Sequence, residues 1–307
     1  MSLNHTLTAV EGIEVGHWTD GEAQTGCTVI LFAGEGCVAS ADVRGAAPGS
    51  RETALLEPEK TVERVQALLL SGGSAFGLGA ADGVMRYLEE QGRGFATPFG
   101  RVPIVPAAVI FDLGAGRADV RPDGPAGYLA AREASPAPVA SGRVGAGTGA
   151  LCGKYLGHDK AQPGGLGNAL LEVAGARVAA LAVVNPLGDI VDPETGTVLA
   201  GAVLADGSRP PFEMMLASVG GAANTTLIAA ITDAPLTKAQ CKALAGSAHA
   251  GVARVTRPSH TAFDGDTAFM VSTARGPEVP PLALSIAVQE VVAAAILDAV
   301  RASNQLG

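Results

Sequence analysis

The sequence places a small polar cluster, Asn224, Thr225 and Thr226, directly before an apolar run. One interpretation is structural, because β-branched threonines are common in strands. The other is chemical: a threonine at the head of a strand can attack the carbonyl before it, and hydrolysis of the resulting ester frees a new N-terminus. That terminus carries a hydroxyl nucleophile and an α-amine titrating near ~7.7–8.0, which suits a base at neutral pH. The cluster therefore predicts either a strand start or a self-cleaving Asn224–Thr225 bond.

A glycine-rich run, GAGTGALCGK, ends at Lys154. It does not match the Walker loop, because Thr148 stands where that loop requires glycine and Tyr155 follows the lysine. It also fails the dinucleotide-binding pattern, whose third glycine is replaced by Ala150. We therefore expect the glycines to form a close-packed turn or strand. Lys154 is one of five lysines in a chain poor in charge, so we expect it to be partly buried and to need a partner or a catalytic task.

Two carboxylates, Asp264 and Asp266, flank a glycine in the segment FDGDT, immediately before another apolar run. The structural interpretation is a turn closed by side-chain-to-backbone hydrogen bonds, which an Asp-Gly pair favours. The functional interpretation is a carboxylate pair held at a strand end, where it orients a neighbouring cation or hydroxyl. The spacing alone leaves both interpretations open.

The histidines and cysteines favour no further chemistry. The histidines have no HExxH or paired metal spacing, so we expect surface or hydrogen-bonded structural residues rather than catalysts. These histidines are His5, His17, His158, His249 and His260. The four cysteines have no CxxC spacing, which argues against a zinc site and a disulfide framework. A Ser-His-Asp triad stays possible, although no GxSxG motif supports it. We predict no metal and no organic cofactor.

The composition is that of a globular protein, with 48% hydrophobic and 17% charged residues among 307. This balance excludes a disordered chain. The net charge of −9 and the lack of a basic run disfavour nucleic-acid binding. The longest uncharged stretch, residues 214–232, contains too many polar residues for a membrane span, and the N-terminus does not resemble a signal peptide. We expect a cytoplasmic protein with neither membrane nor nucleic-acid partners.

Short apolar runs alternate with helical patterns along the chain, which indicates a single α/β domain over residues 1–307. The first two predicted strands form a hairpin with its turn at Gly34–Gly36, and cover residues 27–32 and 37–43. The other predicted strands cover 102–113, made irregular by two prolines, 176–185, 225–232 and 267–273. The predicted helices cover 57–70, 75–90, 237–255 and 281–303. The likeliest exposed loops cover 155–168 and 206–211.

In order and in detail, these segments resemble the DmpA-type aminopeptidases and the NylC-type nylon-oligomer hydrolases, which form one family. The resemblance extends over most of the chain and is far more specific than any single motif. The matching stretches are GxEVGH at 12–17, TGCTVI at 25–30, VPAAVIFDL at 105–113, GRVGAGTGA…GK at 142–154, AVVNPLGDIVD at 182–192, NTTLIAAITDA at 224–234 and HTAFDGDTAF at 260–269.

This resemblance implies a four-layer α/β/β/α sandwich that is made as a precursor and cut into two associated subunits. The local match to the NylC-type branch places the cut between Asn224 and Thr225, which gives a large subunit of residues 1–224 and a small subunit of residues 225–307. Thr225 becomes the nucleophile. The resemblance also suggests a homotetramer of processed protomers.

The other site residues are carried over in the same way. Lys154 corresponds to the lysine beside the nucleophile, and Asn185 to the amide that hydrogen-bonds the oxyanion. Asp264 and Asp266 correspond to carboxylates that anchor Lys154 and the region of the nucleophile. Phe111 stands where several relatives carry tyrosine, so a hydroxyl donated from that position is missing.

The resulting prediction is a self-processing N-terminal-threonine amidohydrolase or aminopeptidase that works through an acyl-enzyme. Its substrates would be short peptides, amino-acid amides or esters, with Phe111 and Thr226 as substrate-binding residues. The DmpA-like branch uses serine where Thr225 stands, so its substrate preference does not transfer. Two alternatives stay open: an acyltransferase that uses the same threonine, and an unprocessed binding protein in which Asn224–Thr226 merely opens a strand.

Overall fold

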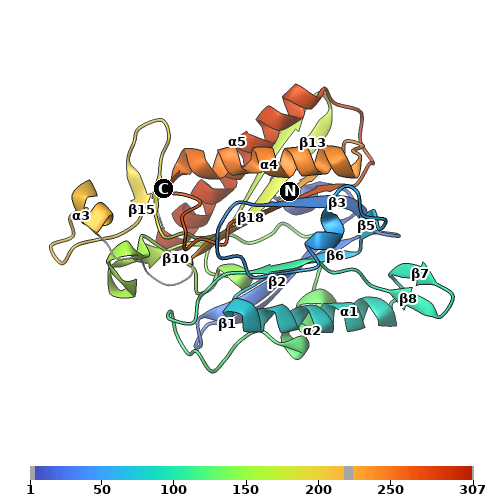
Figure 1. The fold of residues 1–307 in the computed structure, drawn as a ribbon, viewed down its shortest axis with the longest axis horizontal. Coiled ribbons are helices and arrows are strands. Elements are labelled where there is room, and N and C mark those ends of the chain that lie inside the picture. Colours follow the sequence, from blue (N-terminus) through green and yellow to red (C-terminus); the bar gives the residue numbers. More distant parts are fainter. Residues whose placement is uncertain (1–3, 218–223, 306–307) are drawn as a thin grey trace.

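Two β-sheets pack face to face between two layers of helices (Figure 1). The computed structural model describes residues 4–217 and 224–305. Helices α4 and α5 form one outer layer, and helices α1 and α2 form the other (Figure 1). The predicted α/β/β/α sandwich is confirmed.

The first sheet has the strand order β1-β2-β6-β9-β4. Only β6 and β9 are parallel neighbours, and helices α1 and α2 pack on its outer face. Its elements are β1 (Ile13–Asp20), β2 (Thr25–Phe32), β6 (Ala67–Ser71), β9 (Ala107–Val109) and β4 (Ser50–Arg51), with α1 (Ala80–Glu90) and α2 (Gly124–Arg132).

The second sheet has the order β12-β13-β16-β18-β3-β5. Its central strands β16 and β18 are parallel, and β13 runs antiparallel to β16. Helices α4 and α5 pack on its outer face. Its elements are β12 (Gly165–Val173), β13 (Ala176–Asn185), β16 (Thr225–Thr232), β18 (Thr267–Ser272), β3 (Cys37–Val43) and β5 (Arg64–Val65), with α4 (Lys238–Val255) and α5 (Pro281–Asn304).

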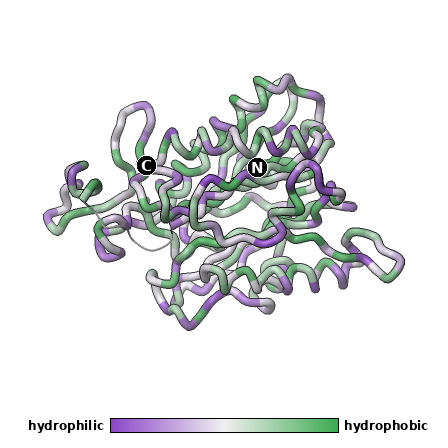
Figure 2. The backbone as a smooth tube through the Cα atoms, in the orientation of Figure 1, coloured by the Kyte–Doolittle hydropathy of each residue, from purple (hydrophilic) through white to green (hydrophobic). Residues whose placement is uncertain are grey.

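Both faces of the second sheet are covered by buried apolar side chains. Along β13, Val178 and Val184 face the helix layer, whereas Leu181 and Val183 face the first sheet. Hydrophobic segments accordingly run through the interior of the sandwich (Figure 2). Helix α5 approaches the sheet closely at Gly167, where a Cβ atom would lie only 2.1 Å from the carbonyl oxygen of Ala295. Small residues at this layer let the helix and the sheet pack in contact.

Two predictions about the N-terminal part of the chain are wrong. Strands β2 and β3 do not form a hairpin, because they belong to different sheets and the chain crosses between the sheets at Gly34–Gly36. The helix predicted over residues 57–70 is replaced by strands β5 and β6. Leu68 and Leu70 face the second sheet, while Leu69 faces the helix layer. A central strand covered on both faces is apolar throughout, and periodicity cannot distinguish such a run from a buried helix.

The predictions for the C-terminal part are confirmed more closely. β13 and β16 begin and end at the predicted residues, and β18 and α5 differ from prediction by a single residue at one end. Helix α4 begins after Thr237, whose side chain accepts a hydrogen bond from the Gln240 amide in a capping box. Helix α1 begins at Ala80 rather than near residue 75, because a 3-10 helix (Ser74–Gly79) precedes it. The irregular strand predicted over 102–113 reduces to β9 and the end of β8 (Gly100–Val102).

Within the described residues, α5 alone is long and apolar enough to cross a membrane. In the structure it instead packs on the second sheet and on α4, with Val288, Val292 and Ile296 buried. Residues 218–223 of the uncharged stretch 214–232 lie outside the described residues.

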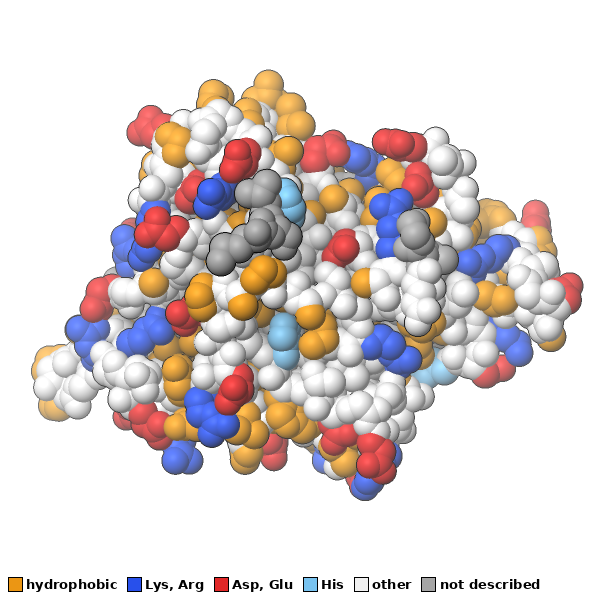
Figure 3. Space-filling view, turned by 180° about the vertical axis from the view of Figure 1, so that it is seen from behind, with side chains coloured by type: hydrophobic (Ala, Val, Ile, Leu, Met, Phe, Trp, Pro, Cys, Tyr) orange, Lys and Arg blue, Asp and Glu red, His pale blue; other side chains and the backbone are white. Residues whose placement is uncertain are grey.

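The remaining elements are short and connect the layers. They are β7 (Phe95–Thr97), β10 (Leu151–Cys152), β11 (Gln162–Pro163), β14 (Asp189–Val191), β15 (Val198–Ala200), β17 (Thr256–Arg257), α3 (Phe212–Ala217) and further 3-10 helices at Leu7–Ala9, Ala54–Leu56, Gly145–Gly147, Lys154–Leu156 and His158–Lys160. Some of these lie in the segment predicted as the loop 155–168, which is therefore partly ordered into elements. On the face seen in Figure 3, basic and acidic side chains are interspersed rather than gathered by sign.

Candidate active site

Three strand ends meet at one edge of the second sheet. Because β16 and β18 are parallel, their first residues lie together, and the antiparallel β13 ends beside them. The register pairs Asn185, the last residue of β13, with Thr225, the first residue of β16. Asn224 forms a bridge with Asp264, just before β18 begins. The topology thus brings together predicted site residues that are far apart in the sequence.

Lys154 enters this edge from the 3-10 helix that follows β10. Its Nζ donates to the backbone oxygen of Asn185 at 2.8 Å and to Asn185 Oδ1 at 2.6 Å, and only 3% of the residue is exposed. Burial lowers the pKa of Lys154 to about 7, although the charges of Cys152, Asp264 and other acidic groups oppose this shift. The burial and the hydrogen-bond partner expected for Lys154 are both present. Its side-chain amine gains or loses its proton close to pH 7.

Gly153 places this lysine. Its φ of +76° is left-handed, and a Cβ atom there would lie 2.0 Å from the backbone nitrogen of Ala202. Only glycine fits such a close approach with that backbone conformation. The last glycine of the run GAGTGALCGK is therefore required by packing and by the turn that aims Lys154 inward, as the structural interpretation of the run expected.

The side-chain amide of Asn185 makes hydrogen bonds within the protein through both its oxygen and its nitrogen. Its Oδ1 accepts hydrogen bonds from Lys154 and from the Leu151 amide at 3.0 Å. Its Nδ2 donates to the backbone oxygen of Phe111 at 3.2 Å. Asn185 lies at the predicted place, and the hydrogen bond that its Nδ2 donates in this uncut chain goes to Phe111 rather than to the carbonyl of Asn224.

The carbonyl of Asn224 has a different donor, the backbone amide of Gly265. Gly265 N donates to Asn224 O at 2.7 Å, and the Thr225 hydroxyl also contacts this carbonyl oxygen. A Cβ atom on Gly265 would lie 2.8 Å from Thr225 Oγ1, so a side chain there would displace the hydroxyl. Gly265 is not among the site residues predicted from the sequence. The available signal was its position between the two aspartates, which was interpreted only as a turn.

Asp264 is a buried carboxylate held by its own loop. Its Oδ2 accepts from the amide and hydroxyl of Thr261 at 2.8 and 2.5 Å, and its Oδ1 from the Leu187 amide at 3.3 Å. Burial, reinforced by the charge of Asp266, raises the pKa of Asp264. The local bonds match the predicted side-chain-to-backbone turn, and they fix the carboxylate beside the strand start as well.

Asp266 holds the start of β16. Its Oδ1 accepts a hydrogen bond from the Thr226 amide at 2.6 Å, and its Oδ2 contacts His260. The predicted anchoring of the nucleophile region is therefore present. Lys154 takes part in no ion pair among the described residues. Asp264 and Asp266 act on the lysine only through their charge.

His260 is a second residue that the sequence analysis undervalued, because a lone histidine gives no spacing signal. Its ring lies at 2.7 Å from Asp266. Phe111 is half-buried, and its backbone oxygen accepts a hydrogen bond from Asn185. Thr226 is buried, and its hydroxyl has no hydrogen-bond partner among the described residues. The structure places both near the candidate nucleophile without testing their predicted contact with substrate.

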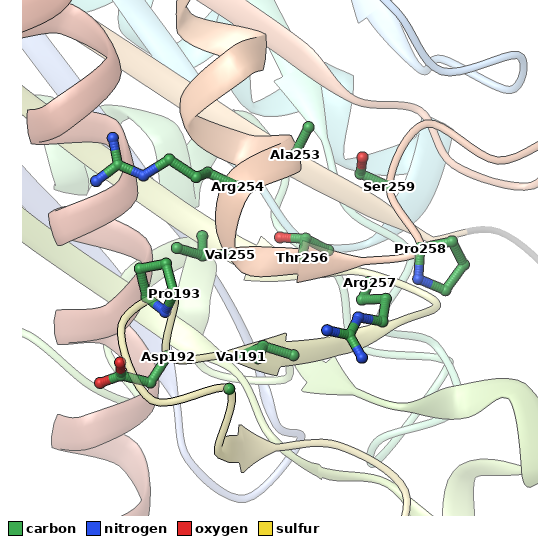
Figure 4. A pocket seen from close by; sticks show the side chains of 11 residues that line it. Val191, Asp192, Pro193, Ala253, Arg254, Val255, Thr256, Arg257, Pro258 and Ser259 are labelled. Carbon is green, nitrogen blue, oxygen red and sulfur yellow. The ribbon is translucent and has the colours of Figure 1, made fainter. Parts of the chain in front are cut away.

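A cavity of about 480 Å³ lies elsewhere, against β14, β17 and the end of α4 (Figure 4). None of the predicted site residues lines it. Its charged residues are partly engaged, since Arg254 pairs with Glu290 and Asp192 with Arg301. Within residues 4–217 and 224–305, no group of three or more histidine, cysteine, aspartate or glutamate side chains could hold a metal ion.

The edge described above can perform acyl chemistry. A hydroxyl touches the carbonyl group that precedes it, and a backbone amide polarises that carbonyl. A buried lysine from a 3-10 helix donates to Asn185, the last residue of the neighbouring strand. An amide aimed at a carbonyl oxygen stabilises the negative charge that develops there during nucleophilic attack. Thr225 is only 3% exposed and Asn224 is fully buried, so an external substrate cannot reach the hydroxyl in the uncut chain.

Comparison with known proteins places these features in context. Peptidase family S58 matches this chain over residues 5–307. An uncharacterized aminopeptidase of Mycobacterium tuberculosis is 45% identical over 296 residues, which cover 90% of this chain and 83% of the relative. A 6-aminohexanoate-oligomer endohydrolase of Kocuria is 33% identical over 270 residues, covering 85% of this chain and 73% of the relative.

A solved structure shows the same fold. The L-aminopeptidase D-Ala-esterase/amidase of Ochrobactrum anthropi, described as a variant of the Ntn hydrolase fold, superposes with a TM-score of 0.74. The superposition covers 98% of this chain and 86% of that one, at 18% sequence identity. This likeness supports the fold of the chain and, at that identity, nothing finer.

Proposed function

The chain belongs to peptidase family S58 and is a hydrolase acting on amide bonds, and from that premise we propose that it is a self-processing amidohydrolase or aminopeptidase whose nucleophile is Thr225. The observation that carries the proposal is the Asn224 carbonyl, held by the Gly265 amide at 2.7 Å and contacted by the Thr225 hydroxyl. The family and the aminopeptidase names of its relatives support the reaction class, and this geometry supports the choice of nucleophile.

Processing begins with attack of Thr225 Oγ1 on the carbonyl carbon of Asn224. The peptide C–N bond breaks, an ester joins Asn224 to the Thr225 oxygen, and the hydroxyl proton passes to the departing nitrogen. Water then hydrolyses the ester, which leaves a carboxylate on Asn224 and a free amine on Thr225. The Gly265 amide stabilises the oxyanion of the first step.

Hydrolysis of an external amide reuses the same groups. The Thr225 amine accepts the hydroxyl proton while Thr225 Oγ1 attacks the substrate carbonyl carbon. The amide C–N bond then breaks, the departing amine takes that proton, and the acyl group stays on Thr225 as an ester. Water hydrolyses this acyl-enzyme, which releases the acid and restores the hydroxyl. The substrate carbonyl takes the place that the Asn224 carbonyl leaves, facing the Gly265 amide. Lys154, buried on Asn185 across the strand pair, favours the deprotonated hydroxyl while it is charged and helps to keep the amine neutral.

Short peptides, amino-acid amides and related ω-amides or esters are the proposed substrates. The relatives' names support this class, because they include aminopeptidases and an enzyme acting on 6-aminohexanoate oligomers. Transfer of the acyl group to an amine, a homotetrameric assembly and a cytoplasmic location stay predictions. Adding a competing amine to the assay and analysing the products separates transfer from hydrolysis.

The test of processing is denaturing electrophoresis with intact-mass measurement. By proportion to length, cleavage of the 30.6 kDa chain before Thr225 gives fragments of about 22 and 8 kDa, and the smaller begins with threonine. Thr225→Ala should leave the chain whole and inactive, and Thr225→Ser should still be cut. Thr232→Ala, a buried threonine at the other end of β16, is the matched control and should process normally.

Two results contradict the proposal. One is a wild-type chain that stays whole after long incubation and hydrolyses no amino-acid amide. The other is Thr225→Ala cut at the same bond, which would move the nucleophile elsewhere.

A further inference from the structure

Asp266 connects the start of β16 to His260, a residue with no role in the function proposed above. Its Oδ1 accepts the Thr226 amide at 2.6 Å, and its Oδ2 accepts His260 Nδ1 at 2.7 Å and the His260 amide at 3.1 Å. The Asp266 side chain is only 2% exposed. Both carboxylate oxygens are therefore occupied, and His260 fixes the orientation in which the other oxygen meets Thr226.

The surroundings of His260 favour its charged form. Burial by itself lowers the pKa of His260, but the hydrogen bond and the charge of Asp266 outweigh burial and raise it above the ordinary value. Burial lowers the pKa of the neighbouring His249, whose Nε2 donates to the backbone oxygen of Asp42 at 3.0 Å. The two rings meet edge to face, with their centroids 4.8 Å apart.

The titratable groups around His260 come from several elements. On its own loop the carboxylates are those of Asp264 and Asp266, α4 contributes His249, and β3 contributes Asp42 behind His249. Lys154 shares the field of the same two aspartates. Acidic groups thus dominate one side of the site, and His260 and Lys154 are the basic groups that face them.

The backbone at His260 also indicates that the surroundings impose its position. Its φ of +55° lies in the left-handed region, which is uncommon for a residue other than glycine. Such a conformation persists where the surrounding contacts determine it. Here the backbone amide and the ring of one residue both bind the same carboxylate oxygen.

We propose that His260 is a positioning residue for the Thr225 nucleophile: as a cation it fixes Asp266 on the Thr226 amide and offsets the carboxylate charge around the Thr225 α-amine. This inference rests on the proposed function, because only a processed chain has that amine. His260 itself touches neither the hydroxyl nor the substrate and acts through Asp266.

The consequence is a shift in the pH dependence of hydrolysis. A base works only in its neutral form, and nearby carboxylates favour the protonated ammonium. Loss of the positive charge at His260 leaves that negative charge unopposed, so the amine holds its proton to higher pH. The acid limb of kcat/KM should move upward by about half a pH unit to one unit, because the histidine acts through Asp266, which holds the residue next to Thr225, and does not contact the amine itself.

Three variants test this inference in the full chain. His260→Asn keeps a nitrogen donor close to the Nδ1 position and tolerates a left-handed backbone, but it loses the cation. His260→Lys restores a permanent cation. His5→Asn makes the same exchange at an exposed histidine. Each protein is first checked for its two processed fragments, and kcat/KM for an amino-acid p-nitroanilide is then measured against pH.

We expect an upward shift of the acid limb in His260→Asn, and limbs at the wild-type position in His260→Lys and His5→Asn. A processed His260→Asn protein with an unmoved limb overturns the inference and leaves the proposed function intact, even if its rate is lower at every pH. A wild-type chain that is never cut removes the proposed function instead.

If His260→Asn folds but is not processed, an imidazole NMR titration of the wild-type protein decides. The signal missing from the variant identifies His260. Titration above the ordinary histidine value of about 6.5 supports the inference, and titration at or below that value overturns it.

Discussion

The two ends of β16 carry the same pair of residue types in different surroundings. Thr225 begins the strand beside the buried Lys154, and Thr232 ends it near the start of α4, where Lys238 is buried. Both threonines are at most 3% exposed. Both lysines donate to backbone carbonyls, and burial lowers the pKa of each. Burial and residue type therefore do not distinguish the two ends.

The difference lies in what each group faces. The Thr232 hydroxyl donates to the Arg177 carbonyl at 2.8 Å, and this hydrogen bond joins the end of β16 to the start of β13. Lys238 donates to three backbone oxygens of the segment before β5. Thr225 instead touches a carbonyl that a backbone amide polarises, beside two buried carboxylates. A buried hydroxyl becomes a candidate nucleophile only where preorganised donors face the carbonyl it would attack.

The largest expected effect comes from Lys154→Met. Loss of the cation should slow processing and hydrolysis by about a thousandfold, the scale seen when a preorganised charge-stabilising group is removed. Lys238→Met is the matched control, and its processing rate should change less than twofold. The measurement is the rate at which the small fragment appears on denaturing gels. Its mass, in proportion to its length, is roughly 8 kDa. Equal processing rates in the two variants would contradict the proposed chemical difference between the two ends of β16.

Gly265→Ala should have the next largest effect. The added methyl group would lie 2.7 Å from the Ala47 carbonyl oxygen and 2.8 Å from Thr225 Oγ1, so the loop and the hydroxyl must move apart. Misplacing a reacting atom by about 1 Å costs about a hundredfold in rate. Gly246→Ala, in α4, meets no atom closer than 3.4 Å and should process normally. Rates are compared by quenched electrophoresis. A Gly265→Ala chain cut as fast as wild type would show that the amide between the aspartates does not position the reaction.

Lys154 should also give the chain a characteristic dependence of stability on pH. Below pH 7 the lysine is charged in both folded and unfolded states, so the cost of burying its charge is fully present. Between about pH 7 and its unperturbed value of 10.5, the folded state has lost the proton that the unfolded state keeps. The free energy of unfolding therefore rises with pH in this window, by at most about 1.4 kcal/mol per pH unit from this group.

Urea unfolding of the uncut Thr225→Ala chain, with and without Lys154→Met, isolates this contribution. The difference in unfolding free energy between the two chains should change between pH 7.5 and 9.5. Parallel pH curves would show that Lys154 keeps an ordinary pKa.

The smallest expected effect is a loss of stability without a loss of activity. Lys238→Met leaves the carbonyls of Leu55, Lys60 and Val62 without their shared donor. We expect a decrease of about 1–3 kcal/mol in the free energy of unfolding, measured in urea. A drop in the catalytic rate of this variant that matches Lys154→Met would contradict a purely structural role.

The residues predicted for the candidate site lie together in the structure, whereas some secondary-structure elements around them were predicted wrongly. Thr225, Lys154, Asn185, Asp264 and Asp266 all meet at one sheet edge. The run at 57–70 was misassigned, because its apolar pattern fits a helix and a doubly covered strand equally well. The roles of Gly265 and His260 were missed for other reasons. The position of Gly265 between two aspartates equally fits an ordinary turn, and a lone histidine leaves no spacing pattern in the sequence.

What the sequence determined by itself was local: the residue types of the site, the limits of β13 and β16, and the cap of α4. These depend on side-chain chemistry and on periodicity within a few residues. Only the tertiary structure decided that β2 and β3 join different sheets, that the Asn185 amide donates to Phe111, and that Gly265 faces the Asn224 carbonyl. Such pairings join residues tens of positions apart, and the hydrogen-bond partner of a group is fixed by strand register rather than by its neighbours in the chain.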